Sequence, residues 1–215
     1  MEPAVMHPLR HKWDEIYKNT PPDFCPGPAH VLQTYEYLLP SRGYAVDLAC
    51  GLGANALFLA KRGFTTRAWD LSPVAVARLN RIARQDNLDL VTEVRDLENT
   101  EIPYQCFDVM VMTRFLDRNL TNALMNALRP GGLLYFQTFV RDKDPSRGPG
   151  DPEYLLAENE LAKMFSGLVL RAYCEAGRIG DVSRGFRGEA FLVGQKPISS
   201  DFQQDSDEVR FHVTN

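Results

Sequence analysis

Apolar residues between positions 44 and 140 recur in short runs, and the segments between these runs carry apolar residues at helical spacing. Runs of strand length lie at 44–49, 65–69, 90–95, 108–112 and 133–140. Segments rich in helix-forming residues lie between them, at 54–62, 73–86 and 121–128. Strands that alternate with helices are typical of a parallel sheet with crossover helices, so the pattern predicts the α/β class.

Local signals mark where the predicted helices begin and end. Ser72 supplies an N-cap, and Pro73 is a favourable first helical residue. Gly63 directly follows the helix at 54–62. The run Pro130-Gly131-Gly132 is expected to separate the helix at 121–128 from the strand that begins at 133.

The pattern changes after residue 140. Residues 141–151 have no apolar period and include four prolines and glycines, which predicts a loop. A helix is predicted at 158–165, followed by a hairpin of strands 168–174 and 189–195. The expected fold is Rossmann-like: a doubly wound, mostly parallel seven-stranded sheet closed by a C-terminal antiparallel hairpin.

The whole pattern predicts one domain over residues 1–196, in which residues 1–40 form an N-terminal helical lid segment. Residues 197–215 hold four acidic side chains and one arginine, a local charge of −3, and are expected to form a loosely held acidic tail. Within this tail, residues 209–213 could pair as an edge strand.

Composition narrows the class of protein. The chain has 215 residues, of which 44% are hydrophobic and 24% charged, a balance typical of globular domains. Its net charge of −4 disfavours a protein that binds nucleic acid. Neither a signal peptide nor an apolar run of membrane-spanning length is present in the sequence, which predicts a soluble, cytoplasmic protein without membrane association.

Cysteine and histidine spacing gives little support to a metal site. Cys25, Cys50, Cys106 and Cys174 are scattered without a Cys-x-x-Cys pair, which favours reduced thiols. His7 and His11 are spaced to share a helix face but lack a third ligand nearby. The sequence therefore predicts no bound metal.

The turn after the first strand carries the candidate chemistry, because ligands of open α/β sheets bind beyond the carboxyl ends of the strands. Gly51, Gly53 and Ala56 satisfy the dinucleotide pattern G-x-G-x-x-G/A. Asp70 follows at the distance of an acid that binds ribose hydroxyls. A nicotinamide cofactor and an adenosine-bearing methyl donor both fit this pattern.

Three further features favour S-adenosylmethionine over a dinucleotide. Asp47 lies inside a buried strand, where a carboxylate would repel a pyrophosphate but could bind an ammonium group. Asp96 and Leu97 end the third strand, where they could hold an adenine ring. The chain contains no Tyr-x-x-x-Lys, the pair that transfers hydride in short-chain dehydrogenases.

Five segments together resemble the class I S-adenosylmethionine-dependent methyltransferases: VDLACGLGAN at 46–55, AWDLSP at 68–73, RDL at 95–97, FDVMV at 107–111 and RPGG at 129–132. The segments WDEIY at 13–17 and ANALFLA at 54–60 are most similar to the subgroup of tellurite-resistance and thiopurine methyltransferases. Ala49 stands where the family often has its first glycine.

The resemblance implies S-adenosyl-L-methionine as cofactor and assigns roles to individual residues. Those expected around the methionine part are Asp47, Gly51 and Gly53. Those expected around the adenosine are Asp70, Leu71, Asp96 and Leu97. Thr113, Arg114 and Phe115 would lie near the sulfonium, with Arg114 and Phe115 positioning the methyl acceptor. Trp13 and Tyr17, spaced on one helix face, could cover the cofactor.

The acceptor implied is a small molecule. No residue stands out as a general base, because the histidines lie outside the predicted strand-end loops, and this favours a soft nucleophile such as a thiol or a selenium or tellurium oxyanion. Seven arginines, at 114, 118, 141, 147, 178, 184 and 187, could form an anion-receiving mouth. Residues 141–188 nevertheless balance eight basic with eight acidic side chains.

Two alternative functions fit the predicted site. The same site could bind the cofactor without catalysis, as a regulatory module, or serve an NAD(P)-dependent oxidoreductase. The loop at 141–151 is expected to act as a lid on the substrate side, with Arg141 and Arg147 facing the acceptor.

Overall fold

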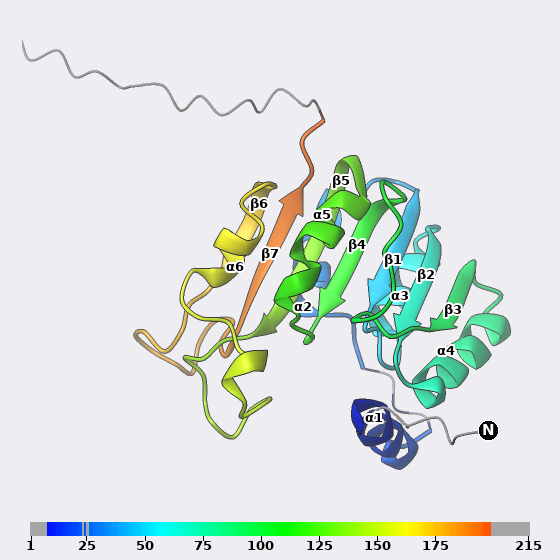
Figure 1. The fold of residues 1–215 in the computed structure, drawn as a ribbon, viewed down its shortest axis with the longest axis horizontal. Helices are drawn as coiled ribbons and strands as arrows, with labels where there is room; N and C mark the ends of the chain where they lie inside the picture. The colour runs from blue at the N-terminus through cyan, green and yellow to red at the C-terminus, as the bar shows by residue number, and fades with distance from the viewer. Residues whose placement is uncertain (1–7, 23, 25, 199–215) are drawn as a thin grey trace, which may run out of the picture.

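A seven-stranded sheet forms the centre of the molecule, with strand order β3-β2-β1-β4-β5-β7-β6 (Figure 1). The computed structural model describes residues 8–22, 24 and 26–198. The strands are β1 (Tyr44–Leu48), β2 (Thr65–Asp70), β3 (Leu90–Val94), β4 (Phe107–Thr113), β5 (Leu128–Phe139), β6 (Val169–Cys174) and β7 (Glu189–Gln195).

Strand directions confirm the expected fold class. The five strands β1 to β5 pair in parallel, whereas β7 runs antiparallel to both β5 and β6. The chain first moves outward through β2 and β3 and then returns to the other side of β1 with β4. This reversal places the topological switch point between β1 and β4, where open α/β sheets bind ligands at the carboxyl ends of their strands.

The helices are α1 (Pro8–Asn19), α2 (His30–Thr34), α3 (Ala54–Lys61), α4 (Pro73–Gln85), α5 (Thr121–Ala127) and α6 (Glu160–Met164). Short 3₁₀ turns add η1 (Glu36–Leu38), η2 (Arg118–Leu120) and η3 (Pro152–Tyr154). The predicted cap of α4 is confirmed, because the Ser72 hydroxyl accepts a hydrogen bond from the Ala75 amide at 3.3 Å. The predicted helix at 158–165 is shorter than expected, because Asn159 has a φ of 58° and does not continue it.

Strand β5 corrects the expectation that residues 129–132 separate a helix from a strand. The helix does stop at Ala127, but β5 begins at once with Leu128, which pairs with Phe107 before a register shift. Lys196 holds the glycines in this extended conformation: its amide donates to the Gly132 carbonyl, and the Gly131 amide donates to the Lys196 carbonyl, both at 2.9 Å. A glycine-rich sequence by itself favours a turn, whereas tertiary pairing makes this one a strand.

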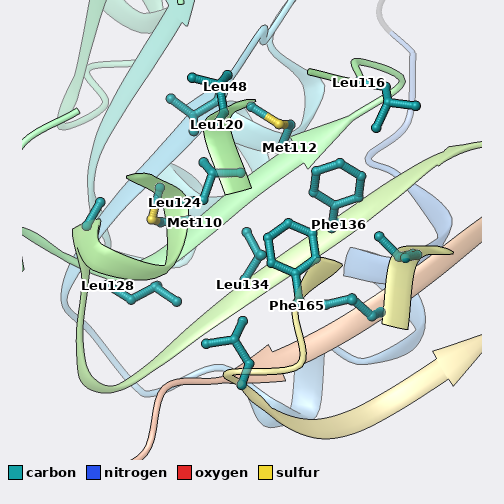
Figure 2. Close-up of a cluster of buried hydrophobic side chains, with 14 of the residues drawn as sticks. Leu48, Met110, Met112, Leu116, Leu120, Leu124, Leu128, Leu134, Phe136 and Phe165 are labelled. Atoms are coloured by element: carbon teal, nitrogen blue, oxygen red, sulfur yellow. The ribbon is translucent and has the colours of Figure 1, made fainter. Parts of the chain in front are cut away.

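One face of the sheet is covered by α5 and α6, with the largest apolar cluster between them (Figure 2). Met110, Met112 and Phe136 project from the strands toward Leu124 of α5 and toward Phe165, which follows α6. Each of these side chains is almost completely buried, a state worth about 1.5–3 kcal/mol per large apolar side chain. This packing fixes the strands whose ends build the site.

The opposite face is covered by α2 and α3. Val31 and Leu32 of α2 are fully buried against apolar residues of the central strands, among them Val109 and Tyr135. Part of the segment 1–40, expected as a lid, is therefore core. Among the helices of the described residues, none combines the length and apolar character that crossing a membrane requires.

Candidate functional site

The turn between β1 and α3 needs glycine at two positions. Gly53 is the N-cap of α3, with a φ of +79°, and a Cβ there would lie 2.4 Å from the Leu79 side chain. Gly51 has a φ of +53°, and a Cβ there would lie 2.8 Å from the Tyr17 hydroxyl. Both residues combine a left-handed backbone with close neighbours, so the turn requires residues without a side chain at these positions.

Asp70, at the end of β2, lies beside this turn and is hydrogen-bonded to it. One carboxylate oxygen accepts a hydrogen bond from the Gly51 amide at 2.7 Å, and the other accepts from the Ser72 amide at 2.8 Å. The side chain is 6% exposed, and burial raises the pKa of its carboxyl group. Since each carboxylate oxygen can accept a second hydrogen bond, Asp70 keeps acceptor capacity toward the space that it lines.

Asp47 lies beneath the turn, in β1. It is fully buried, and its carboxylate accepts hydrogen bonds from the Ala56 amide at 3.1 Å and from Asn55 Nδ2 at 3.4 Å. Burial raises its pKa to about 7. The predicted need of this buried carboxylate for a partner is met within the chain, because the first turn of α3 supplies two donors.

Eleven of the twelve candidate site residues line one cavity of about 390 Å³ at the carboxyl ends of β1, β2 and β4. They are Trp13, Tyr17, Gly51, Gly53, Asp70, Leu71, Asp96, Leu97, Thr113, Arg114 and Phe115. Asp47 does not line the cavity and reaches it only through Asn55, whose amide nitrogen also donates to the Thr113 hydroxyl at 3.2 Å.

Helix α1 borders the cavity, which places Trp13 and Tyr17 where they could cover a ligand. Their rings stack with centroids 5.8 Å apart. The segment after α1 is held by Arg78 of α4, whose guanidinium donates to the carbonyl oxygens of Tyr17, Thr20, Pro21 and Pro22 at 2.7–3.1 Å. Ser72 also donates a hydrogen bond to Asp14 of α1, so Arg78 and the start of α4 together hold this helix beside the cavity.

The end of β3 contributes Asp96 and Leu97. The two carboxylate oxygens of Asp96 accept hydrogen bonds from the Glu98 amide at 3.1 Å and from Asn99 Nδ2 at 2.8 Å. Leu97 is 5% exposed and belongs to the main apolar cluster. Asp96 is thus fixed by its own turn, and Leu97 gives this wall an apolar surface.

Arg114 is held by a network that the sequence did not reveal. Its Nε donates to Glu189 Oε1 at 3.1 Å, although its side chain is 63% exposed. Gln137 donates to the second oxygen of buried Glu189 at 2.6 Å and accepts from the Val31 amide at 2.9 Å. The network joins β4, β5, β7 and α2, which only the tertiary fold brings together.

His30 also lines the cavity, as do Gln137 and Phe186. The His30 ring stacks on Phe186 with centroids 4.5 Å apart and an interplanar angle of 10°. His30 lies outside the strand-end loops, as the sequence predicts. It nevertheless reaches the site, because α2 packs on the sheet and places its first residue at the cavity.

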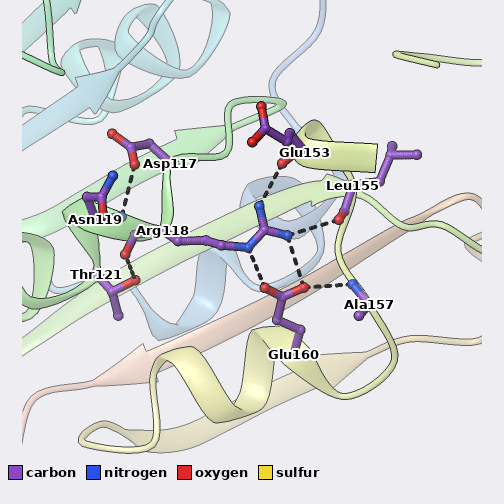
Figure 3. Close-up of polar contacts among 8 residues, drawn as sticks. All are labelled: Asp117, Arg118, Asn119, Thr121, Glu153, Leu155, Ala157 and Glu160. Carbon is purple, nitrogen blue, oxygen red and sulfur yellow. Dashed lines mark hydrogen bonds and ion pairs between the residues drawn. The ribbon is translucent and has the colours of Figure 1, made fainter. Parts of the chain in front are cut away.

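A single arginine-lined mouth is not present, because only Arg114 of the seven arginines lines this cavity. Arg118 instead binds Glu160 and the carbonyl oxygens of Glu153 and Leu155 (Figure 3). Arg147 lines a different cavity together with Arg178 and Arg187. Arg141 and Arg184 line neither cavity.

Metal-binding geometry is not found among residues 8–22, 24 and 26–198, where no three or more His, Cys, Asp or Glu side chains are grouped to hold an ion. Three cysteines, Cys50, Cys106 and Cys174, are free thiols. Cys25 and His7, considered above, lie outside the described residues, as do the edge strand expected at 209–213 and nearly all of the acidic tail.

Residues 13–184 match the model of the family described as "Tellurite resistance protein TehB". The chain belongs to the TehB family of class I methyltransferases. The match contains almost all of the cavity lining, from Trp13 in α1 to Phe115 after β4.

Relatives of known sequence support this membership over part of the chain. The Haemophilus influenzae protein described as "Probable S-adenosyl-L-methionine-dependent methyltransferase TehB" is 28% identical over 138 residues, which are 60% of this chain and 47% of that protein. "Hemagglutinin 1" of Eikenella corrodens is 30% identical over 138 residues, 61% of this chain and 45% of that protein. The chain thus matches about half the length of these curated relatives.

Solved structures show the same fold. The crystal structure of TehB from Haemophilus influenzae aligns with a TM-score of 0.62 at 22% identity, over 77% of this chain and 61% of that one. An S-adenosylmethionine-dependent methyltransferase from Mesorhizobium loti aligns with a TM-score of 0.59 at 18% identity, over 78% of this chain and 98% of that one. The sheet order seen in this TehB-family chain is therefore that of class I methyltransferases.

Proposed function

We propose that this TehB-family protein transfers a methyl group from S-adenosyl-L-methionine to a small-molecule acceptor. The observation that carries the proposal is the family match over residues 13–184, which spans the glycine turn, Asp70 and the strand ends around the cavity. The name of the Haemophilus influenzae relative supports the same cofactor and reaction.

The residues of the cavity fit this cofactor. Asp70 has acceptor capacity for two ribose hydroxyls, and Asp96 with Leu97 offers an acceptor beside an apolar wall for adenine. The turn at Gly51 and Gly53 would lie against the methionine part, because neither residue has a side chain that would block its approach. The cavity volume of about 390 Å³ lies within the range usual for small-molecule sites.

The bound cofactor would supply an activated methyl group on a sulfonium whose departure leaves a neutral thioether. The protein then has to position the acceptor and exclude water, and positioning alone can supply roughly 7–11 kcal/mol of a barrier. Arg114, oriented by Glu189, and Phe115 are the side chains that would position the acceptor. Helix α1 would cover the cofactor through Trp13 and Tyr17.

The acceptor that we propose is a soft nucleophile, a thiol or a selenium or tellurium oxyanion. Such nucleophiles need little deprotonation before attack, which suits a site built from positioning groups. The description of the family as tellurite-resistance proteins supports the oxyanion. His30 is the one titratable imidazole on the described part of the cavity wall, and it would accept a proton if the acceptor is a thiol.

Cofactor identity is tested by thermal shift and turnover. S-adenosylmethionine and S-adenosylhomocysteine should raise the melting temperature, and NAD or NADP should not. Stabilisation by NAD alone would instead establish the oxidoreductase alternative. Incubation with S-adenosylmethionine and dithiothreitol, selenite or tellurite should yield S-adenosylhomocysteine, measured by chromatography. Tight cofactor binding without turnover on any acceptor would favour the non-catalytic binding module.

A further inference from the structure

A second cavity, of about 300 Å³, lies between the loop after β5 and the segment before β7. Four basic residues line it, namely Lys143 and Arg147 from the loop and Arg178 and Arg187 from the segment. Asp144 is the single acidic residue in the lining. The excess of three positive charges stands out in a chain whose net charge is −4.

Lys143 is the most informative member of this group. The residue is only 6% exposed, and its ammonium, which keeps some solvent contact, has neither a hydrogen bond nor an ion pair with any residue in the described ranges 8–22, 24 and 26–198. A largely buried lysine loses part of its hydration, and proteins normally pair such a charge. An anion held in the cavity would supply the missing partner.

Neighbouring carboxylates do not neutralise the basic residues by direct pairing. Asp142 accepts the backbone amide of Arg178 at 2.7 Å, and Asp144 accepts the amide and hydroxyl of Ser146 at 2.9 and 2.8 Å. The Ser146 hydrogen bonds, with the charges of Arg178 and Arg147, hold the pKa of Asp144 below its usual value. Asp142 is therefore occupied by the segment before β7, and Asp144 by its own loop.

Arg187 shapes the wall of the cavity. Its guanidinium donates to the carbonyl oxygens of Ala176, Gly177, Asp181 and Arg184 at 2.7–3.2 Å, so its donors hold the segment before β7. The cations left to bind a ligand are Lys143, Arg147 and Arg178. Three cations with several N–H donors that line one cavity match a tetrahedral oxyanion with two charges.

We propose that this cavity binds the phosphoryl group of a small phosphorylated molecule. The site shares no lining residue with the cavity that holds Asp70 and Arg114, so it is separate from the proposed cofactor site. The two are linked through β7, because Gly188 lines the second cavity while Glu189 orients Arg114 in the first. The proposal does not depend on which reaction the first cavity performs.

The test is calorimetric titration of the full chain with inorganic phosphate and with pyrophosphate, at constant ionic strength against chloride. Wild-type protein should bind both anions, and Lys143→Met should weaken binding about tenfold or more, because a buried charge-assisted contact is lost. Lys163→Met removes an exposed charge on α6 and should leave binding unchanged. S-adenosylhomocysteine should bind wild type and Lys143→Met equally and should not displace phosphate.

A second variant combines Arg147→Gln with Arg178→Gln. Both arginine side chains are exposed, so their loss should not disturb folding. This double variant should also lose phosphate affinity. The proposal is wrong if Lys143→Met or the double variant binds phosphate like wild type, or if wild type binds neither anion. It is also wrong if S-adenosylhomocysteine displaces phosphate competitively, because the anion then occupies the cofactor cavity.

Discussion

At the scale of single residues, Asp70 combines a structural and a proposed binding role in one carboxylate. Its oxygens hold the amides of Gly51 and Ser72 while the side chain lines the cavity. Asp70→Ala should weaken S-adenosylhomocysteine binding roughly 10- to 150-fold, because hydrogen bonds to a charged group are worth about 1.5–3 kcal/mol. Calorimetry measures the dissociation constant directly.

The matched control for this change is Asp86→Ala, an acid at the exposed C-cap of α4 that pairs only with Lys61 across the surface. It should bind the ligand like wild type. An unchanged dissociation constant in folded Asp70→Ala would remove Asp70 from the proposed ribose site.

Gly53 offers a second residue-scale prediction, on stability. An alanine there would need a left-handed backbone, and its Cβ would press against Leu79 in the core. Gly53→Ala should lower the free energy of unfolding by roughly 1–3 kcal/mol, as overpacking in a close-packed core does. Gly150→Ala, where no atom lies within 4 Å of the new Cβ, should change it little. Equal urea midpoints for the two variants would contradict the steric argument.

The site residues that the sequence predicts and those that it does not predict differ in how the fold brings them to the site. Asp70 ends β2, and Gly51 and Asp96 lie shortly after β1 and β3, so the strand pattern alone brings them to one edge of the sheet. Glu189, Gln137 and His30 reach the site through β7, β5 and α2, and no local pattern reports those contacts. Asp47 stands out in the sequence as a carboxylate inside an apolar strand. Its partners on α3 depend on backbone geometry that a sequence does not display.

At the scale of elements, α1 is held to the rest of the molecule chiefly by polar contacts. Arg78 binds four backbone carbonyls after and within α1, and Arg10 Nε donates to the Leu71 carbonyl at 3.2 Å. The side chains of Trp13 and Ile16 remain at least 40% exposed. Such an element is expected to open at a lower free energy than the core.

Arg78→Ala should therefore release α1 while leaving the sheet intact. We expect faster tryptic cleavage at Lys12 and Lys18 and weaker S-adenosylhomocysteine binding, because Trp13 and Tyr17 would no longer cover the cavity. The near-ultraviolet circular dichroism should keep its core signal. Arg81→Ala, an exposed arginine on the same helix, serves as control. Unchanged cleavage and affinity in Arg78→Ala would show that α1 is held by other contacts.

Most elements could be predicted because each has its own signal: apolar runs for β1 and β4, and Ser72-Pro73 for the start of α4. The errors fall where a long-range contact decides. Residues 129–132 form a strand because Lys196 pairs with them. Helix α2, only five residues long, is fixed by burial of Val31 and Leu32 rather than by its sequence.

At the scale of the whole molecule, the buried carboxyl of Asp47 links folding and ligand binding to pH. Its pKa is about 7 in the folded chain, against an ordinary value of 3.8. The folded state therefore binds a proton between about pH 4 and pH 7 that the unfolded state has lost. From this group alone, the free energy of unfolding should fall as pH rises through that window and level off above it.

Asp47→Asn should remove this slope, and the difference between the two pH profiles isolates Asp47 from Asp70, whose pKa burial also raises. If the ammonium of the cofactor lies near Asp47, it stabilises the ionised form, so binding should release a proton and affinity should increase as the pH rises toward about 7. Calorimetry in buffers of different ionisation enthalpy counts that proton. If Asp47→Asn released as many protons on cofactor binding as wild type does, the Asp47 carboxylate would only hold the first turn of α3.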